Sequence, residues 1–411
     1  MKISTHVSCY SSIFVILIIA HTCSCDTPSE TERISTPQEK FVTASNEFAL
    51  DLHRTLTFNS IRNLFMSPVS LFSALGVLYK GARGKTAQEL RGMLRFAETG
   101  LSDEDIDLSF NHFLTNVLNS SKDYIMKSAN IFLVDRKLQL LPEYTLQTQN
   151  LYKSIYVTGI NFRRDASQLV KVINDWISSQ TNGKIPALLD NLDPNTVIAI
   201  FNAVYFKGLW EIQFDVKNTK PGRFNNYGLK SMSKSVPMMN MSDQLLYTSS
   251  PDCQIVELPY KGDNVSMMIF LPDRQNGLSA LERNLTVQQI LAFRRKMRRT
   301  RVNLSLPKFS MESTVDLKQP LTSMGLGGVF LDNADFSGMV QRGGVRVSKM
   351  VQKTVVEVTE EGTEAAAVTG VFIVPLSISW PRDVKVDHPF LFAIIETKTN
   401  LILFMGRVVN L

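Results

Sequence analysis

The sequence predicts an α+β fold, with helices in its first half and strands in its second half. Apolar residues recur mostly at helical spacing between residues 41 and 176, interrupted by one strand candidate at 129–134. From residue 197 onward, β-branched or alternating runs predominate. No repeat and no linker rich in Gly, Ser or Pro divides the chain, so we expect one large domain.

The individual elements follow from these patterns. Helices are predicted at 41–56, at 67–78, where Ser67-Pro68 opens the helix, and at 86–94. Strands are predicted at 197–206, 254–258, 265–271, 302–306 and 345–358. Residues 390–395 and 401–409 predict a hairpin around Thr-Lys-Thr-Asn at 397–400.

The first 25 residues are typical of a secretory signal peptide. Lys2 precedes the apolar run 13–20, and cleavage is expected near Ser24 or Cys25. A short amphipathic anchor is the alternative, because the run is far below the roughly 20 residues that span a bilayer. We expect residues 26–411 to form the mature domain, with 26–40 as a polar amino-terminal extension.

Removal of the signal leaves Cys253 alone in the mature domain, since Cys9, Cys23 and Cys25 lie in or beside the removed segment. It is expected to be a buried small hydrophobe, and an intermolecular bridge is the less favoured reading. Five sequons support secretion, and their asparagines are Asn119, Asn240, Asn264, Asn284 and Asn303. Asn119 and Asn284 are expected to be glycosylated more readily than Asn303, which lies in a strand pattern.

The sequence offers little for an ordinary catalyst. His53, His112 and His388 are scattered, and no HExxH, GxSxG or paired-cysteine motif is present. The glycine cluster at 325–328 lacks nucleotide-binding spacing and predicts a turn. We expect no enzymatic activity, no metal and no cofactor.

An unusual segment covers residues 359–387. Its residues 361–367, Glu-Gly-Thr-Glu-Ala-Ala-Ala, resemble the reactive-loop hinge of inhibitory serpins. Other segments resemble serpin signatures in the expected order, and they cover residues 63–70, 201–210, 306–309, 334–337 and 388–392. The resemblance implies a metastable fold of about nine helices and three β-sheets, whose exposed loop inserts into the main sheet after protease attack.

The hinge residues suit insertion as a strand. These residues are Glu361, Gly362, Thr363, Glu364, Ala365, Ala366, Ala367, Val368 and Thr369. If Thr363 faces the core, then Ala365, Ala367 and Thr369 also face it, and all are small. Insertion of about 14 residues at roughly 3.3 Å each would carry an attached protease about 45 Å.

Family spacing places the reactive bond between Leu376 and Ser377, and Val374 and Pro375 precede it. An aliphatic side chain suits the apolar specificity pocket of chymotrypsin-, cathepsin G- or elastase-like serine proteases. Trypsin-like enzymes are disfavoured, because Arg382 lies six residues beyond Leu376. The segment after the bond is about two residues longer than the resemblance leads one to expect, which changes the contacts offered to a protease.

Two further sites are implied by the resemblance. Ser67, Ser70 and Asn202 match the polar cluster beneath the sheet where its strands part, and Trp210 matches the aromatic residue where the loop enters. Gln352 replaces the usual histidine of that cluster. Since an amide does not titrate near neutral pH, we expect opening of the sheet to be less sensitive to mild acid than in relatives. The alternative is that these residues are ordinary polar or aromatic core residues whose hydrogen bonds are satisfied within the fold.

The net charge of +6 is concentrated in one place. Residues 292–301 carry six cations and no acid, namely Arg294, Arg295, Lys296, Arg298, Arg299 and Arg301. Read as one helix, the segment stacks Arg294 on Arg298 and Arg295 on Arg299. Its position resembles the basic helix that some serpins use for heparin, whereas a solvated face without a ligand is the alternative. Nucleic acid is a poorer partner for a secreted chain.

The sequence therefore predicts a secreted, monomeric serine protease inhibitor that traps its target covalently, with heparin as a second partner and no membrane partner. The alternative is a non-inhibitory serpin that acts as a carrier or a ligand- or glycosaminoglycan-binding protein. The small inward-facing hinge residues favour inhibition.

Overall fold

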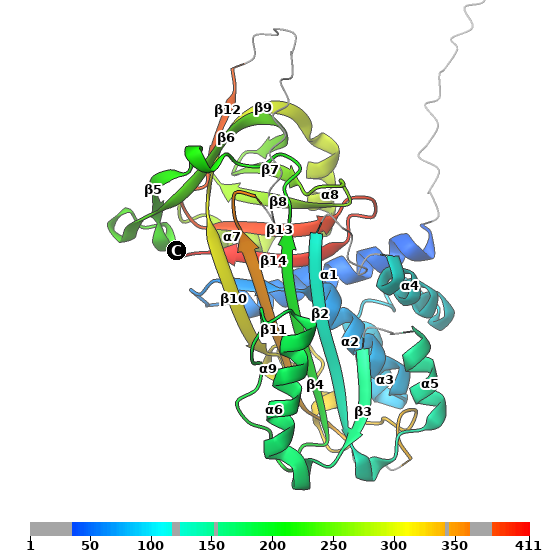
Figure 1. Cartoon of the computed structure of the whole chain (residues 1–411). Coiled ribbons are helices and arrows are strands. Elements are labelled where there is room, and N and C mark those ends of the chain that lie inside the picture. Colours follow the sequence, from blue (N-terminus) through cyan, green and yellow to red (C-terminus); the bar gives the residue numbers. More distant parts are fainter. Residues whose placement is uncertain (1–34, 117–123, 152–154, 342–344, 362–379) are drawn as a thin grey trace, which may run out of the picture. The chain divides into compact units, whose positions relative to one another are not determined.

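The computed structural model describes residues 35–116, 124–151, 155–341, 345–361 and 380–411, which contain nine α-helices and two hydrogen-bonded β-sheets (Figure 1). The predicted α+β class is confirmed. The helices are α1 (Pro37–Thr57), α2 (Pro68–Gly81), α3 (Gly84–Met93), α4 (Asp103–Asn116), α5 (Pro142–Leu151), α6 (Phe162–Gln180), α7 (Leu278–Asn284), α8 (Val287–Lys296) and α9 (Lys318–Ser323). Residues 36–411 form one compact unit.

The smaller sheet has five strands in the order β10-β11-β4-β2-β3. Their bounds are β10 Phe309–Asp316, β11 Val347–Val358, β4 Ile198–Gly208, β2 Tyr124–Asp135 and β3 Ile155–Ile160. β4 and β11 are direct parallel neighbours, in register from Val347 opposite Ile198 to Val356 opposite Phe206. Because these two strands bond directly to each other, no strand lies between them.

The larger sheet has nine strands, eight of them in the order β1-β14-β13-β8-β7-β6-β9-β12, with β5 paired to β6. Their bounds are β1 Leu64–Met66, β5 Lys220–Asn225, β6 Ser233–Ser250, β7 Cys253–Pro259, β8 Val265–Pro272, β9 Arg298–Pro307, β12 Arg382–Lys385, β13 Phe390–Glu396 and β14 Ile402–Val408. β6 is long enough to pair with β9 along one part and with β7 along its end. β6 thus joins two parts of the larger sheet, one on its β7 side and one on its β9 side. If these parts are counted as separate sheets, the molecule has the three sheets that the resemblance implies.

The central strand β4 of the five-stranded sheet is covered on both faces, which explains its hydrophobic sequence. Figure 1 shows α6 crossing one face, where Ile173 and Ile177 pack on Phe201 of β4. The opposite face, which includes Val204 and Phe206, belongs to the main core with α1 and α2. A strand buried on both faces reads as a continuous apolar run, which is why β4 was predictable, whereas β11 was predictable from its β-branched residues.

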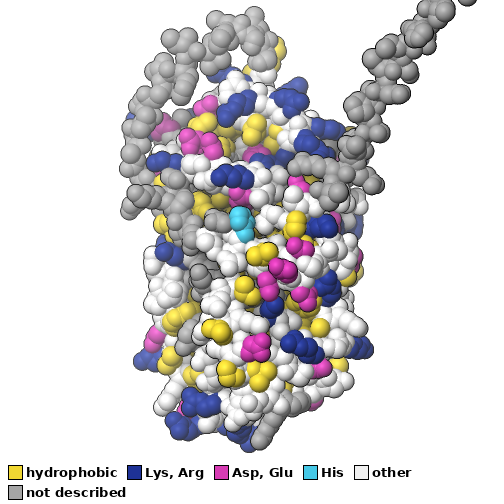
Figure 2. All heavy atoms as spheres, turned by 90° about the vertical axis from the view of Figure 1, so that its right-hand side faces the viewer, with side chains coloured by type: hydrophobic (Ala, Val, Ile, Leu, Met, Phe, Trp, Pro, Cys, Tyr) yellow, Lys and Arg dark blue, Asp and Glu magenta, His cyan; other side chains and the backbone are white. Residues whose placement is uncertain are grey.

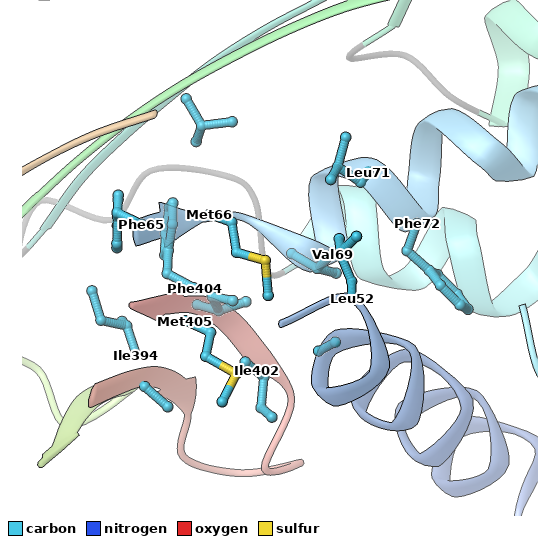
Figure 3. Close-up of a cluster of buried hydrophobic side chains, with 14 of the residues drawn as sticks. Leu52, Phe65, Met66, Val69, Leu71, Phe72, Ile394, Ile402, Phe404 and Met405 are labelled. Atoms are coloured by element: carbon cyan, nitrogen blue, oxygen red, sulfur yellow. The ribbon is translucent and has the colours of Figure 1, made fainter. Parts of the chain in front are cut away.

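The main core joins the start of α2 to the end of the chain. Figure 3 shows Phe65 and Met66 of β1 beside Phe404 and Met405 of β14, with α1 and α2 closing the cluster. The rings of Phe65 and Phe404 stack with centroids 5.1 Å apart. This contact places the beginning of α2, and hence Ser67, directly under the five-stranded sheet.

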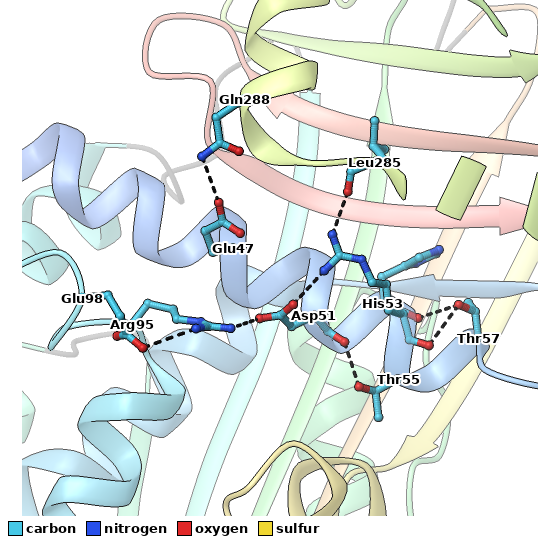
Figure 4. Close-up of polar contacts among 10 residues, drawn as sticks. Glu47, Asp51, His53, Thr55, Thr57, Arg95, Glu98, Leu285 and Gln288 are labelled. Atoms are coloured by element: carbon cyan, nitrogen blue, oxygen red, sulfur yellow. Dashed lines mark hydrogen bonds and ion pairs between the residues drawn. The ribbon is translucent and has the colours of Figure 1, made fainter. Parts of the chain in front are cut away.

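Helix α1 starts at Pro37, four residues before the apolar pattern predicts. Thr36 and Glu39 form a reciprocal capping box, and Pro37 occupies the first helical position. Polar contacts tie the helix to its neighbours: Arg95 bonds Asp51, and Gln288 donates to Glu47 over 3.4 Å (Figure 4). Part of the predicted polar extension is therefore helical and capped.

Cys253 is a free, buried thiol, as predicted. Burial, reinforced by Asp273 and Asp252, raises its pKa to about 12, so the thiolate is scarce at neutral pH. Among the described residues, no group of His, Cys, Asp and Glu side chains is arranged to hold a metal ion. None of the helices in these ranges combines the length and the hydrophobicity of a membrane span.

Candidate functional site

A buried polar cluster joins β4 and β11 to the start of α2. Gln352 of β11 lies opposite Asn202 of β4, and its Nε2 donates to Asn202 Oδ1 over 2.5 Å and to the Ser67 carbonyl over 2.9 Å. The Ser67 N–H in turn donates to Gln352 Oε1 over 3.0 Å. One side chain therefore bridges two strands and supplies an acceptor at the amino-terminal end of α2.

The cluster extends to β2 through Asn130, which sequence reasoning did not identify. Asn202 Nδ2 donates to Ser70 Oγ over 2.5 Å and to Asn130 Oδ1, while Asn130 Nδ2 donates to Ser128 over 2.9 Å. The structure thus brings Ser67, Ser70, Asn202 and Gln352 together. Separating β4 from β11 leaves these buried groups without partners unless water or a new strand replaces them, at about 1–3 kcal/mol for each group.

The residues that follow β11 are held in place by the segment after β4. The indole N–H of Trp210 donates to the Thr359 carbonyl over 2.8 Å, and its ring stacks on Tyr260 with centroids 4.5 Å apart. The Phe214 N–H donates to the Glu360 carbonyl over 3.0 Å. The backbone is therefore fixed up to the residue before Glu361, which is exposed and accepts from Gln213 over 3.3 Å.

Glu360 also anchors this end of the strand, and sequence reasoning did not select it. Its buried carboxylate pairs with Lys308 at 2.7 Å and accepts from the Thr219 hydroxyl over 3.0 Å. Burial opposes ionisation, but the hydrogen bonds and the charge of Lys308 outweigh it, so the pKa of Glu360 is lowered. Two sequence features could have pointed to Glu360: the acidic residue next to it, Glu361, and the Leu-Pro-Lys-Phe segment that contains Lys308.

Most of the predicted reactive segment lies outside the described residues. This holds for hinge positions 362–369 and for residues 374–377, which include Leu376 and Ser377. The structure instead fixes the two points between which the segment runs, Glu361 after β11 and Trp380 before β12.

The basic segment is not one helix, so the predicted stacking of its arginines is wrong. Helix α8 ends at Lys296, buried Met297 caps it, and Arg298 begins β9. Arg294 is also engaged within the fold: its Nη2 and Nε lie 2.8 and 3.1 Å from the two oxygens of Glu257. Because Glu257 is buried, Arg294 is a structural residue rather than a surface cation.

The other five cations of the segment are exposed and make no ion pair with the described residues. They are Arg295, Lys296, Arg298, Arg299 and Arg301. Figure 2 shows Lys and Arg side chains gathered at the upper end of the face where α8 lies in Figure 1. The basic patch predicted from the sequence therefore remains, without Arg294.

The sequons occupy different environments. Asn284 is exposed at the end of α7, whereas Asn264 is half-buried in a turn. The amide nitrogens of Asn240 and Asn303 donate to the Asn218 carbonyl over 2.8 Å and to Asp383 over 2.7 Å, respectively. Asn119 lies outside the described residues.

Replacing Glu360 with Gln should destabilise the protein at neutral pH by about 1–2 kcal/mol, since a half-buried ion pair is lost. Because the pKa of Glu360 is lowered by folding, its contribution is present above the unfolded pKa of about 4.3 and disappears as the pH falls through the folded value. Thermal unfolding of both proteins should therefore differ at pH 7 and converge in acid. Glu312→Gln, which breaks the more exposed pair with Lys353, is the control and should cost about 0.5 kcal/mol or less.

Replacing Gln352 with His should introduce acid sensitivity into the cluster. The described partners of Gln352 are the backbone N–H and carbonyl of Ser67 and the side-chain amide of Asn202, all neutral, so a buried imidazolium would have no counter-charge. Burial would lower the pKa of that histidine, and stability would be lost as the pH falls below about 6.5, its unfolded pKa. The difference in melting temperature between pH 7.5 and 5.5 measures this effect. Equal differences for wild type and variant would contradict it.

Comparisons with known proteins agree with this geometry. A sequence profile described as "Serpin (serine protease inhibitor)" matches residues 43–411. Human serpin B4 is 37% identical over 89% of this chain and 97% of that protein. Leukocyte elastase inhibitor from Bos taurus is 36% identical over 90% of this chain and 99% of that protein. A crystal structure of human thyroxine-binding globulin superposes with a TM-score of 0.83 at 29% identity, covering 91% of this chain and 99% of that one. With full-length relatives, a matching profile and a shared fold, the chain belongs to the serpin family.

Proposed function

We propose that the chain is an inhibitory serpin and a suicide substrate of chymotrypsin-, cathepsin G- or elastase-like serine proteases. The observation that carries this proposal is the direct pairing of β4 with β11, whose far end leads into a hinge of small residues. The relative named leukocyte elastase inhibitor supports the class of target. Val374, Pro375 and Leu376 would occupy the protease subsites before the cut.

The proposed chemistry needs no catalytic group from this chain. The serine oxygen of the protease attacks the Leu376 carbonyl, the bond to Ser377 breaks, and Ser377 leaves as a free amine. The freed hinge then enters between β4 and β11, which removes the ladder between them and creates two new ladders. The sheet gains one ladder, and each of its hydrogen bonds contributes about 0.5–1.5 kcal/mol net. This gain drives displacement of the acylated protease.

Incubation with chymotrypsin, cathepsin G and neutrophil elastase should give a covalent complex that survives a denaturing gel. Leu376→Arg should transfer complex formation to trypsin, because its specificity pocket holds a carboxylate. Cleavage of the wild type without any complex would instead support the alternative, a non-inhibitory carrier or ligand-binding serpin. Unchanged specificity of the variant would show that the bond is placed wrongly.

A pair of hinge variants separates insertion from recognition. Ala365→Glu places a charge on the side expected to face the core, whereas Ala366→Glu places the same charge on the outer side. Both should be cleaved at the same rate. Only Ala366→Glu should retain most of the covalent complex. Equal loss in both variants would contradict the proposed register.

We also propose that heparin binds the five exposed cations around the junction of α8 and β9. The triple variant Arg298→Ala/Arg299→Ala/Arg301→Ala should elute from heparin-agarose at clearly lower salt. With three fewer cations, its binding releases fewer counterions from the polyanion, and its affinity for heparin is lower. Arg163→Ala/Lys171→Ala removes two exposed cations from α6 and should elute like wild type. Equal elution of all three proteins would remove heparin as a partner.

The chain is further proposed to be secreted, glycosylated and monomeric. Secretory expression should give an amino terminus near Asp26, and glycopeptide mapping should find Asn284 occupied. Asn303 should be unmodified, because its amide nitrogen is engaged with Asp383. Retention of residues 1–25 would contradict secretion through a cleaved signal.

A further inference from the structure

A hollow of about 550 Å³ lies between α7, α8 and the turn at 250–253 that joins β6 to β7. Half-buried apolar side chains line it, among them Leu281 of α7 and Ala292 and Phe293 of α8. Leu281 and Phe293 also pack against the main core, so this apolar wall is supported from behind. The volume lies within the range of about 300–1,000 Å³ in which proteins enclose small ligands. The hollow is therefore large enough for a molecule the size of a disaccharide.

Polar groups of mixed charge surround the apolar wall. Arg274, Lys296 and Asp252 line the hollow, and all three side chains are exposed and make no ion pair with other described residues. A charged ligand would meet a like charge at this rim, whereas a neutral polyol finds both donors and acceptors there. Sugar rings combine an apolar face of C–H groups with hydroxyl groups around their edge. The hollow therefore has the chemistry of a carbohydrate site.

Asn284, the asparagine of an Asn-Leu-Thr sequon, lines the same hollow. Its side chain is exposed and makes no hydrogen bond with the described residues, unlike that of Asn303. The backbone beside it is fixed, because the Leu285 N–H donates to the Leu281 carbonyl over 2.9 Å and the Leu285 carbonyl accepts from Arg54 over 2.7 Å. A glycan attached to Asn284 would therefore start from a fixed point at the edge of the hollow.

We propose that the hollow is the seat of the Asn284 glycan, whose first N-acetylglucosamine residues pack on Phe293 and Leu281 and hydrogen-bond to the polar rim. This inference rests on the proposed glycosylation of Asn284. Packing removes the apolar faces of the sugars and of the wall from water, which favours the packed state over a solvated one. Because the glycan is covalently attached, its effective concentration at the hollow is high, so a weak contact is sufficient.

A packed glycan stabilises the folded protein. It bridges α7, α8 and the turn between β6 and β7, and these segments are brought together only in the folded state. A group that binds the folded state and not the unfolded state shifts the equilibrium toward folding. The glycan at this position is therefore a structural part of the mature protein rather than a solvated appendage.

The experiment measures how fast peptide-N-glycosidase releases the Asn284 glycan from the native, secreted protein, as followed by glycopeptide mapping. Ala292→Trp fills the hollow from the α8 side and should displace the sugars. Native release should then be about tenfold faster than in wild type, because opening of the packed glycan no longer limits cleavage. Ser279→Trp is the matched control, since Ser279 is exposed on α7 and does not line the hollow. Its release rate should equal that of wild type.

A second measurement does not depend on access of the glycosidase. Asn284→Gln removes the glycan and should lower the melting temperature by about 2 °C in wild type and in Ser279→Trp. In the Ala292→Trp background the same change should have no effect, because the contact is already lost.

Equal release rates for wild type and Ala292→Trp, with melting temperatures that do not depend on the glycan, would overturn the packed glycan. Glycosylation and protease inhibition would both stand. An unmodified Asn284 in the secreted protein would overturn this inference together with the proposed occupancy of that sequon. Neither result bears on formation of a covalent complex with a protease, which is measured separately.

Discussion

The hydrogen-bonded contact between β4 and β11 is the constraint on which the rest of the molecule depends. β4 is buried on both faces, β11 is buried on one face and half-buried on the other, and the polar cluster of Gln352 and Asn202 lies directly across their junction. The two strands are in register from Val347 opposite Ile198 to Val356 opposite Phe206, so the sheet is closed at this junction. Any separation of these strands would break the hydrogen bonds of the polar cluster, while Trp210 and Glu360 hold the residues that follow β11.

Buried ion pairs join the elements that surround this junction. Glu282 of α7 joins Arg407 of β14 and His53 of α1 at 3.1 and 2.9 Å. Arg294 does the same for α8 by pairing with Glu257 of β7. Removing one partner from such a group leaves an uncompensated buried charge, which costs about 3–5 kcal/mol. Buried ion pairs thus link strands of the larger sheet to its helices, whereas neutral polar groups bridge β4 and β11 in the five-stranded sheet.

The sequence was informative where burial was strongest. β4 and the terminal hairpin were predictable because their side chains are buried on both faces, and β11 because it is rich in β-branched residues. In contrast, β6, β5 and β12 were missed because they are polar and lie partly in solvent. The cluster residues were available only through the family resemblance, and Asn130 escaped even that. The basic segment was read as one helix because neither Gly nor Pro marks its end. Its break depends on the burial of Met297, and the partner of Arg294 lies 37 residues away in the sequence. Such contacts come from tertiary packing and leave no local pattern.

The chain segment beyond Leu376 contains β12, β13 and β14. β13 lies inside the larger sheet, bonded to β14 on one side and to β8 on the other, and its residues are fully buried. A cut in the loop therefore produces two polypeptides that remain interlocked as one particle. The short fragment contributes central strands of the core, so it can separate only when the whole fold is denatured, and the cleaved molecule keeps the size and composition of the intact one in solution.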